Sequence, residues 1–127
     1  MSEQLSAEQL QPIFEAVRNA AKLCRTVQET EIVASEKAGR EPVTIADYGS
    51  QAIICRAIGG AIPEDAVISE ERGHHFLNEV ADAQRARVVA LVGEILGESG
   101  TEDDIVSWLD HGRDRETSRT WVIDPID

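Results

Sequence analysis

The chain has 127 residues, which is long enough for one domain with a modest core. Its 24 acidic residues outnumber 12 basic ones, and a net charge of −12 argues against binding to nucleic-acid polymers or anionic membranes, which attract basic surfaces. Because 42% of the residues are hydrophobic but only 4% are aromatic, the core is predicted to be aliphatic.

The sequence also bears on where the protein works. No apolar run reaches the ~18 residues that a membrane-spanning helix needs. The first four residues lack the basic and apolar segments of a signal peptide. Cys24 and Cys55 each lie in an apolar helical pattern, which favours a reduced, buried pair over a disulfide. Together these features predict a cytoplasmic protein that binds no membrane.

A long amphipathic helix is predicted from Ser6 to about Glu29 or beyond. Ser6 and Gln9 have the form of a capping box, in which each side chain pairs with the backbone N–H of the other residue. Charged residues fall on one face, so the helix is predicted to cover a sheet and to carry no catalytic group. The apolar face is formed by Leu10, Ile13, Phe14, Val17, Ala20, Ala21, Cys24 and Val27.

The next stretch, residues 35–42, is charged, contains a glycine and a proline, and is predicted to be a loop. Thr44 and Asp47 follow it at the spacing of a helix N-cap and a first-turn acid, which both favour the positive end of a helix. A second helix is predicted from Asp47 to Ile58. It is largely apolar, is expected to be buried between layers, and is predicted to end at the glycines 59–60.

A turn at 62–65 leads into a short strand predicted at 66–69, whose apolar residues indicate burial. Glu70 and Glu71 follow the strand directly. Adjacent glutamates in this position are compatible with exposed loop acids, and they are also compatible with a site that uses carboxylates.

A polar loop is predicted at 72–78. His74 and His75 lie in it, but adjacent side chains point different ways and neither has a Cys or His partner at zinc spacing. The remaining predicted elements are a helix at 79–96 ended by glycines at 97–100, a helix that starts after Thr101 and stops at Gly112, and a charged loop at 113–118.

The chain ends with a β-favouring apolar run, Trp121 to Ile123, followed by Asp124, Pro125, Ile126 and Asp127. Pro125 has no N–H for a sheet ladder and stiffens the turn. A buried strand would thus deliver two carboxylates to its carboxyl end, where ligands of α/β sheets usually bind. Such oxygens suit Mg²⁺, although aspartates also cap turns without any ligand.

Three blocks in order, PVTIAD at 42–47, SEE at 69–71 and WVIDPID at 121–127, resemble the lithium-sensitive, Mg²⁺-dependent phosphatases of the inositol monophosphatase superfamily. The stretch KAGREPVTIADYGSQ at 37–51 is similar to the 3′(2′),5′-bisphosphate nucleotidase branch in particular. The resemblance implies an α/β, layered fold. In that reading residues 1–127 are the N-terminal portion of one phosphatase domain, an αβαβα sugar-phosphatase-type sandwich.

The resemblance also implies roles for particular residues. Two or three Mg²⁺ ions would be bound by Glu70, Asp124, the backbone carbonyl of Ile126, and Asp127. Asp47 would orient or deprotonate the attacking water. Supporting roles would fall to Lys37, Thr44 and Glu71, for which a solvated loop lysine, a helix cap and a loop acid are the alternatives.

The implied substrate is 3′-phosphoadenosine 5′-phosphate or its sulfated precursor, and inositol phosphates and fructose 1,6-bisphosphate are the alternatives. The family motif continues as D-P-[IVL]-D-G-T, whereas this sequence stops at Asp127. The expectation is therefore a site completed by a longer chain, or by a second polypeptide that continues after Asp127. The other reading is a non-catalytic fragment.

Overall fold

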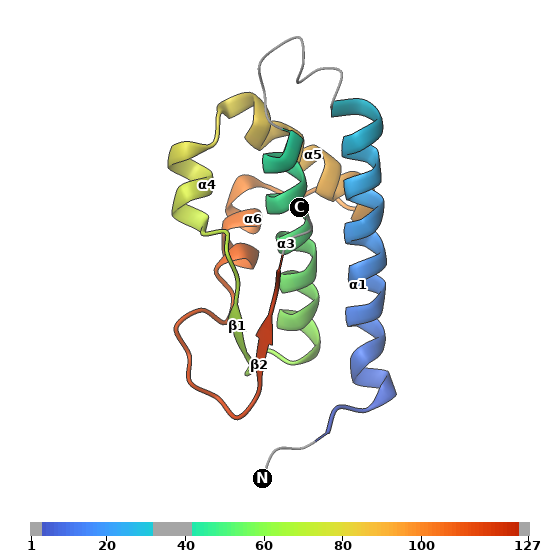
Figure 1. Cartoon of the computed structure of the whole chain (residues 1–127), viewed down its shortest axis with the longest axis vertical. Helices are drawn as coiled ribbons and strands as arrows, with labels where there is room; N and C mark the ends of the chain where they lie inside the picture. Colours follow the sequence, from blue (N-terminus) through green and yellow to red (C-terminus); the bar gives the residue numbers. More distant parts are fainter. Residues whose placement is uncertain (1–3, 32–41, 125–127) are drawn as a thin grey trace.

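The computed structural model describes residues 4–31 and 42–124. The described part is mostly helical and contains a small parallel sheet (Figure 1), so the predicted layered α/β class is confirmed. The elements in chain order are α1 (Ala7–Thr26), the π-helical turn η1 (Val27–Glu31), α3 (Pro42–Ala61), β1 (Ala66–Ile68), α4 (Gly73–Glu79), α5 (Asp82–Leu96), α6 (Glu102–Leu109) and β2 (Thr120–Val122).

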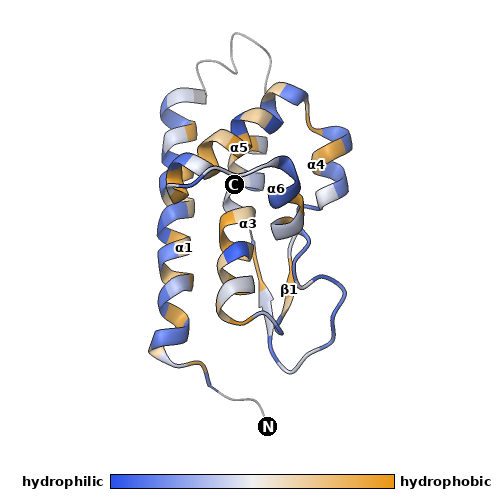
Figure 2. Ribbon diagram, turned by 180° about the vertical axis from the view of Figure 1, so that it is seen from behind, coloured by the Kyte–Doolittle hydropathy of each residue, from blue (hydrophilic) through white to orange (hydrophobic). Residues whose placement is uncertain are grey.

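Helix α1 begins as predicted. The backbone N–H of Gln9 donates to Ser6 Oγ at 3.1 Å, and that of Ser6 donates to Gln9 Oε1 at 2.9 Å. Hydrophilic and hydrophobic stripes alternate along the helix (Figure 2). The prediction of its apolar face was wrong at three residues: Phe14 and Val17 are 54% and 51% exposed, and Ala21 is also exposed. These side chains lie beside the stripe that is buried, not within it. The buried stripe is Ile13, Ala16, Ala20 and Leu23.

Helix α3 occupies the centre of the molecule, with α1 on one side and α6 on the other (Figure 1). Helix α5 packs against both α3 and α1. Its middle is buried, as predicted. It begins at Pro42 rather than Asp47, so the prediction of Thr44 as an N-cap was wrong. Proline suits the first position of a helix, where no backbone N–H is needed. This start places Thr44 and Asp47 inside the helix.

The glycines at 59–60 do not end α3, which continues to Ala61. Close packing, rather than the end of a helix, explains why a glycine suits position 59. A Cβ on Gly59 would lie 3.3 Å from the ring of His111, so the glycine lets this ring approach the helix closely. The helical hydrogen-bond pattern also runs on, with Ile62 N–H donating to the carbonyl of Ile58 at 2.8 Å.

The two strands pair in parallel, with Val67 opposite Trp121 and Ile68 opposite Val122. Both strands are where the sequence predicted them, to within a residue at each end. Burial was predicted correctly only for Ala66 and Val67, since Ile68 is 61% exposed and Val122 is 71% exposed. One face of the sheet packs towards α3 through Val67 and Trp121, and the other face is open.

Residues 73–79 form helix α4, so the prediction of a loop there was wrong. The cause is Phe76, which is fully buried and anchors an otherwise polar turn. The helix predicted at 79–96 starts only at Asp82, because Val80 is extended and the guanidinium of Arg85 binds the carbonyls of Leu77 and Val80.

Two further predicted boundaries are confirmed, the end of α5 before Gly97 and the start of α6 after Thr101, whereas α6 ends at Leu109, three residues before the predicted stop at Gly112. Gly97 ends α5 with a φ of 74°, and Gly112 follows α6 with a φ of 75°, values that suit glycine. Thr101 caps α6 through the N–H of Asp104. In the described ranges, no helix is both long and apolar enough to cross a membrane.

Neither cysteine is in a disulfide, as predicted. Cys55 is buried, and burial raises the pKa of its thiol to about 12. Cys24 was predicted to be buried, but it is partly exposed, and its Sγ lies 3.2 Å from Ser50 Oγ.

Candidate active site at the sheet edge

The parallel pairing of β1 and β2 brings two predicted site residues to one edge of the sheet. Ile68 and Val122 are opposite each other in the register, and Glu70 and Asp124 each follow two residues later. The N–H of Ile123 donates to the carbonyl of Ile68 at 2.9 Å, which extends the pairing towards that edge. Since the carboxyl ends of parallel strands are where α/β folds bind ligands, this edge is the candidate site.

The first half of α3 contributes to the same region. A cavity of about 270 Å³ is lined by Thr44, Asp47, Tyr48, Glu71, Glu79, Val80 and Gln84. Asp47 also lines a second, mostly apolar cavity of about 370 Å³ that includes Asp124 and Trp121. Asp47 thus borders both the Glu71 side and the Asp124 side. The structure brings Thr44, Asp47 and Glu71 together in one cavity and Asp47 with Asp124 in the other.

Tyr48 is hydrogen-bonded to Glu71 and was not identified from the sequence. Its hydroxyl donates to the Glu71 carboxylate, and its ring packs against Phe76 with centroids 5.3 Å apart. Burial, followed by the negative charge and hydrogen bond of Glu71, raises the pKa of Tyr48 to about 12. Burial and then the charge of Glu70 raise the pKa of Glu71, and the Tyr48 hydrogen bond opposes that rise. Glu71 therefore lies in the less hydrated part of the site.

Two further side chains, Gln51 and Arg113, bind the backbone of the segment that carries the glutamates. Gln51 bonds to both backbone groups of Glu71, and Arg113 bonds to Ser69 and Glu71. Neither was identified from the sequence. The available signal was that Gln51 is a lone amide within the apolar part of a predicted buried helix, where a buried polar group must find partners.

Asp65 anchors the other side of the edge. It is only 4% exposed, accepts from Trp121 Nε1 at 2.9 Å and pairs with the Arg119 guanidinium at 3.3 Å. These contacts tie β2 to the turn before β1 and so fix the strand that leads to Asp124. The sequence placed Asp65 in a turn and assigned it no partner.

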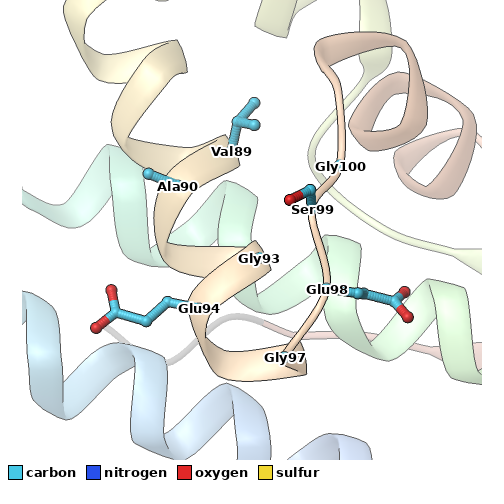
Figure 3. Close-up of a pocket in the computed structure, with 8 residues that line it drawn as sticks. All are labelled: Val89, Ala90, Gly93, Glu94, Gly97, Glu98, Ser99 and Gly100. Atoms are coloured by element: carbon cyan, nitrogen blue, oxygen red, sulfur yellow. The ribbon is translucent and has the colours of Figure 1, made fainter.

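A third hollow, about 520 Å³ between α5 and residues 97–100, contains none of the predicted site residues (Figure 3). Its wall is mostly small side chains and backbone, and Figure 3 shows the carboxylates of Glu94 and Glu98 pointing in opposite directions. Glu98 is paired with Arg56. The two carboxylates of this hollow therefore do not converge on a common point.

Comparison with known proteins identifies the family. The model of the inositol monophosphatase family matches residues 6–127. The chain belongs to the inositol monophosphatase family. It is 31% identical to a 3′(2′),5′-bisphosphate nucleotidase of Oryza sativa over 95% of this chain and 37% of that protein. It is also 33% identical to a 3′(2′),5′-bisphosphate nucleotidase of Schizosaccharomyces pombe, over 88% of this chain and 36% of that protein. The chain thus spans little more than a third of the curated relatives it matches.

The inositol monophosphatase family is generally metal-dependent, and the donors present suit a hard cation. Glu70 and Asp124 offer exposed carboxylates at one edge, which is the chemistry that Mg²⁺ prefers. Within residues 4–31 and 42–124, however, no three acidic, histidine or cysteine side chains form a group able to hold an ion. Lys37, Ile126 and Asp127 lie outside the described residues, so their predicted roles stay predictions.

Proposed function

We propose that the chain is part of a Mg²⁺-dependent phosphomonoesterase that removes the 3′-phosphate from 3′-phosphoadenosine 5′-phosphate, or from its sulfated precursor. The observation that carries the proposal is the parallel register, from which Glu70 and Asp124 follow their strands at one edge, together with the cavity that Asp47 and Asp124 both line. The names of the nucleotidase relatives support the substrate class. We place the protein in the cytoplasm and expect lithium to inhibit it.

Glu70, Asp124, the carbonyl of Ile126 and Asp127 would hold two or three Mg²⁺ ions. When bound, such ions neutralise phosphate charge, lower the pKa of a water and stabilise the leaving oxygen. The carboxylates concentrate negative charge at this edge of a chain whose net charge is −12. A phosphorylated substrate would be repelled from this edge unless metal ions or nearby basic residues reverse the local charge, and bound Mg²⁺ would do so.

Asp47 would orient the attacking water and accept its proton at a carboxylate oxygen. The reaction breaks the bond between phosphorus and the 3′ oxygen, and the products are inorganic phosphate and, from the first substrate, AMP. Helix α3 gives Asp47 a rigid mount, and Thr44 lines the same cavity one helical turn before it. Glu71 and Lys37 would support the site without touching the phosphorus.

The test begins with protein purified from its native source, whose polypeptides are identified by intact mass. Phosphate release is then measured with Mg²⁺ and with EDTA, and 3′-phosphoadenosine 5′-phosphate, inositol monophosphate and fructose 1,6-bisphosphate are compared. We expect the nucleotide to be the best substrate and lithium to slow its hydrolysis. A preference for either of the other two would replace the proposed substrate.

The matched variants are Glu70→Gln and Glu64→Gln. Both positions are exposed, but Glu64 lies in the turn before β1, at the opposite end of the strand. Glu70→Gln should lower phosphate release by more than about 100-fold, beyond the loss typical of partners that only surround metal ligands. Glu64→Gln should leave it unchanged. Activity that survives Glu70→Gln would remove Glu70 from the mechanism.

The non-catalytic fragment makes the opposite prediction for the isolated chain. Mg²⁺ that binds the folded state raises the melting temperature, in proportion to the logarithm of its concentration over Kd. A chain that holds no ion would show no such rise with Mg²⁺.

A further inference from the structure

We propose that Gln51 and Arg113 are positioning residues that together set where the Glu70 and Glu71 carboxylates stand. This inference rests on the proposed function and goes beyond it, because neither residue belongs to the proposed ligand or catalytic set. The segment concerned is short. Strand β1 ends at Ile68 and α4 begins at Gly73, so residues 69–72 lie in no regular element that would hold their backbone.

The Gln51 side chain pairs with both backbone groups of Glu71, as the backbone of a neighbouring β-strand would. Its side chain is buried, with 2% exposure, in the middle of α3. Glu71 N–H donates to Gln51 Oε1 at 2.8 Å, and Gln51 Nε2 donates to the carbonyl of Glu71 at 2.7 Å. A second bond runs from Nε2 to the carbonyl of Leu109 at 3.2 Å. This pattern admits only one orientation of the amide, because a flipped amide would turn its oxygen towards two carbonyls.

Arg113 binds the same segment at the two residues that flank Glu70. Its guanidinium donates to Ser69 Oγ at 3.0 Å, to the Ser69 carbonyl at 3.2 Å and to the Glu71 carbonyl at 2.7 Å. It also donates to the Leu109 carbonyl at 3.2 Å, and Gln51 donates to the same carbonyl. Glu70 therefore lies between two residues whose carbonyls are held by one planar fork. A lysine ammonium has three donors and no such fork, so it cannot reproduce this geometry.

Asp110 completes the arrangement. One of its oxygens lies 3.6 Å from Arg113 Nε, which is too long for a hydrogen bond but close enough for charge pairing. The same oxygen accepts from the N–H of Gly73 at 2.9 Å. The four-residue connection is thus held at its start by Arg113, at Glu71 by Gln51 and Arg113, and at its exit by Asp110. Side chains that act in catalysis need such support, because small displacements of a ligand weaken both binding and reaction.

The test uses the natively produced protein with Mn²⁺ as the probe metal. The variants are Gln51→Met, which removes all three bonds of the amide at similar volume, Gln51→Glu, which retains an acceptor for Glu71 N–H, and Arg113→Lys. The matched control is Arg85→Lys. Arg85 is 17% exposed against 14% for Arg113. It also donates to backbone carbonyls, those of Leu77 and Val80, and pairs with acids, but at the α4–α5 connection.

Mn²⁺ affinity is measured by titration calorimetry, hydrogen exchange at the Glu71 amide by NMR, and folding by the melting temperature. We expect Gln51→Met and Arg113→Lys to weaken Mn²⁺ binding by about 10- to 100-fold, the effect typical of partners that orient ligands. Gln51→Glu should weaken it at least as much, because its second oxygen would face the carbonyls of Glu71 and Leu109 in place of the donating Nε2. Exchange at the Glu71 amide should be faster in Gln51→Met, and Arg85→Lys should lower the melting temperature without changing Mn²⁺ affinity.

Unchanged Mn²⁺ affinity in folded Arg113→Lys and Gln51→Glu proteins would overturn the inference while leaving the proposed function intact. So would an equal loss of affinity in Arg85→Lys, because the effect would then be a general loss of stability. A wild-type protein that binds no Mn²⁺ and releases no phosphate would overturn the proposed function, and the inference with it.

Discussion

The two sides of the candidate site are built differently. On the side of Glu70 and Glu71, the backbone is held by side chains from α3 and from the segment after α6. On the side of Asp124, strand β2 pairs only with β1 among the residues that the structure describes, and Val122 is 71% exposed beside an apolar cavity. The Glu70 and Glu71 side is therefore fixed by many contacts within the described residues, whereas the Asp124 side depends on the pairing with β1 and on the contacts of Asp65.

The largest contrast should appear between two phenylalanines. Phe76 is fully buried under the Glu71 side, whereas Phe14 is 54% exposed on α1. Phe76→Ala should lower the free energy of unfolding by about 3–5 kcal/mol, as expected for a large cavity. Phe14→Ala should change it by less than about 0.5 kcal/mol. Denaturant titration measures both, and a similar cost for the two would contradict the assignment of the core.

Trp121 tests the anchor of the Asp124 side. Trp121→Phe removes the indole N–H that donates to buried Asp65 and leaves Arg119 as the partner of that carboxylate. We expect a loss of about 1–3 kcal/mol in unfolding free energy, the cost of an unmade buried hydrogen bond. The control is Trp108→Phe, because Trp108 is half-buried and its ring centroid lies 5.4 Å from the guanidinium carbon of Arg56. Equal losses in the two variants would mean that Asp65 does not depend on Trp121.

His111 gives a smaller, pH-dependent effect. Burial, and then the positive charge of Arg115, lower the pKa of its imidazole, so the folded state favours the neutral ring. His111 therefore contributes to the free energy of unfolding above pH 6.5, the ordinary pKa of histidine. This contribution is lost as pH falls through the lower pKa of the folded state. His111→Phe, which keeps a ring against Gly59, should therefore lose less stability than the wild type between pH 7.5 and pH 5.5.

The contribution of Glu71 to stability should change with pH in the opposite direction, and the same experiment measures it. Its folded pKa is raised, so its contribution to stability is present below pH 4.5 and is lost as pH rises through the folded value. Glu71→Gln should remove this decrease in stability with rising pH, and it should leave the decrease caused by His111 at low pH unchanged. Melting curves of the two variants and of the double variant separate the contributions, and parallel curves for wild type and His111→Phe would rule out the His111 effect.

The smallest effect is expected on the open face of the sheet. Val122→Thr should change the unfolding free energy by less than about 0.5 kcal/mol, since the side chain is already in water. Val67→Thr is the matched control in the paired strand, and it should cost more because Val67 is 3% exposed and would bury a hydroxyl. A large cost at Val122 in denaturant titrations would mean that this face is covered.

Much of the fold could be predicted because its signals are local. The helix starts at Ser6 and Thr101 and the glycine stop at Gly97 each depend on neighbouring residues and on a general backbone preference. The errors arose where tertiary contacts override local preference. Phe76 draws a polar stretch into a helix by burial, and Gly59 serves the His111 ring rather than a helix end.

The candidate site divides in the same way. The carboxylates after each strand could be predicted, since parallel strands place their carboxyl ends together. The partners of Glu71 could not, because Gln51 lies 20 residues before it and Arg113 lies 42 residues after it. Local patterns carry no information on which long-range side chain supplies a hydrogen bond, so such partners become visible only in the fold.

The central claim is that Glu70 and Asp124 share a divalent metal at the edge of the parallel sheet. It is tested most directly by anomalous diffraction from crystals of the natively produced protein soaked in Mn²⁺. We predict an anomalous peak within about 2–2.5 Å of carboxylate oxygens of both residues. A peak bound elsewhere, with none at this edge in protein that releases phosphate, would contradict the claim.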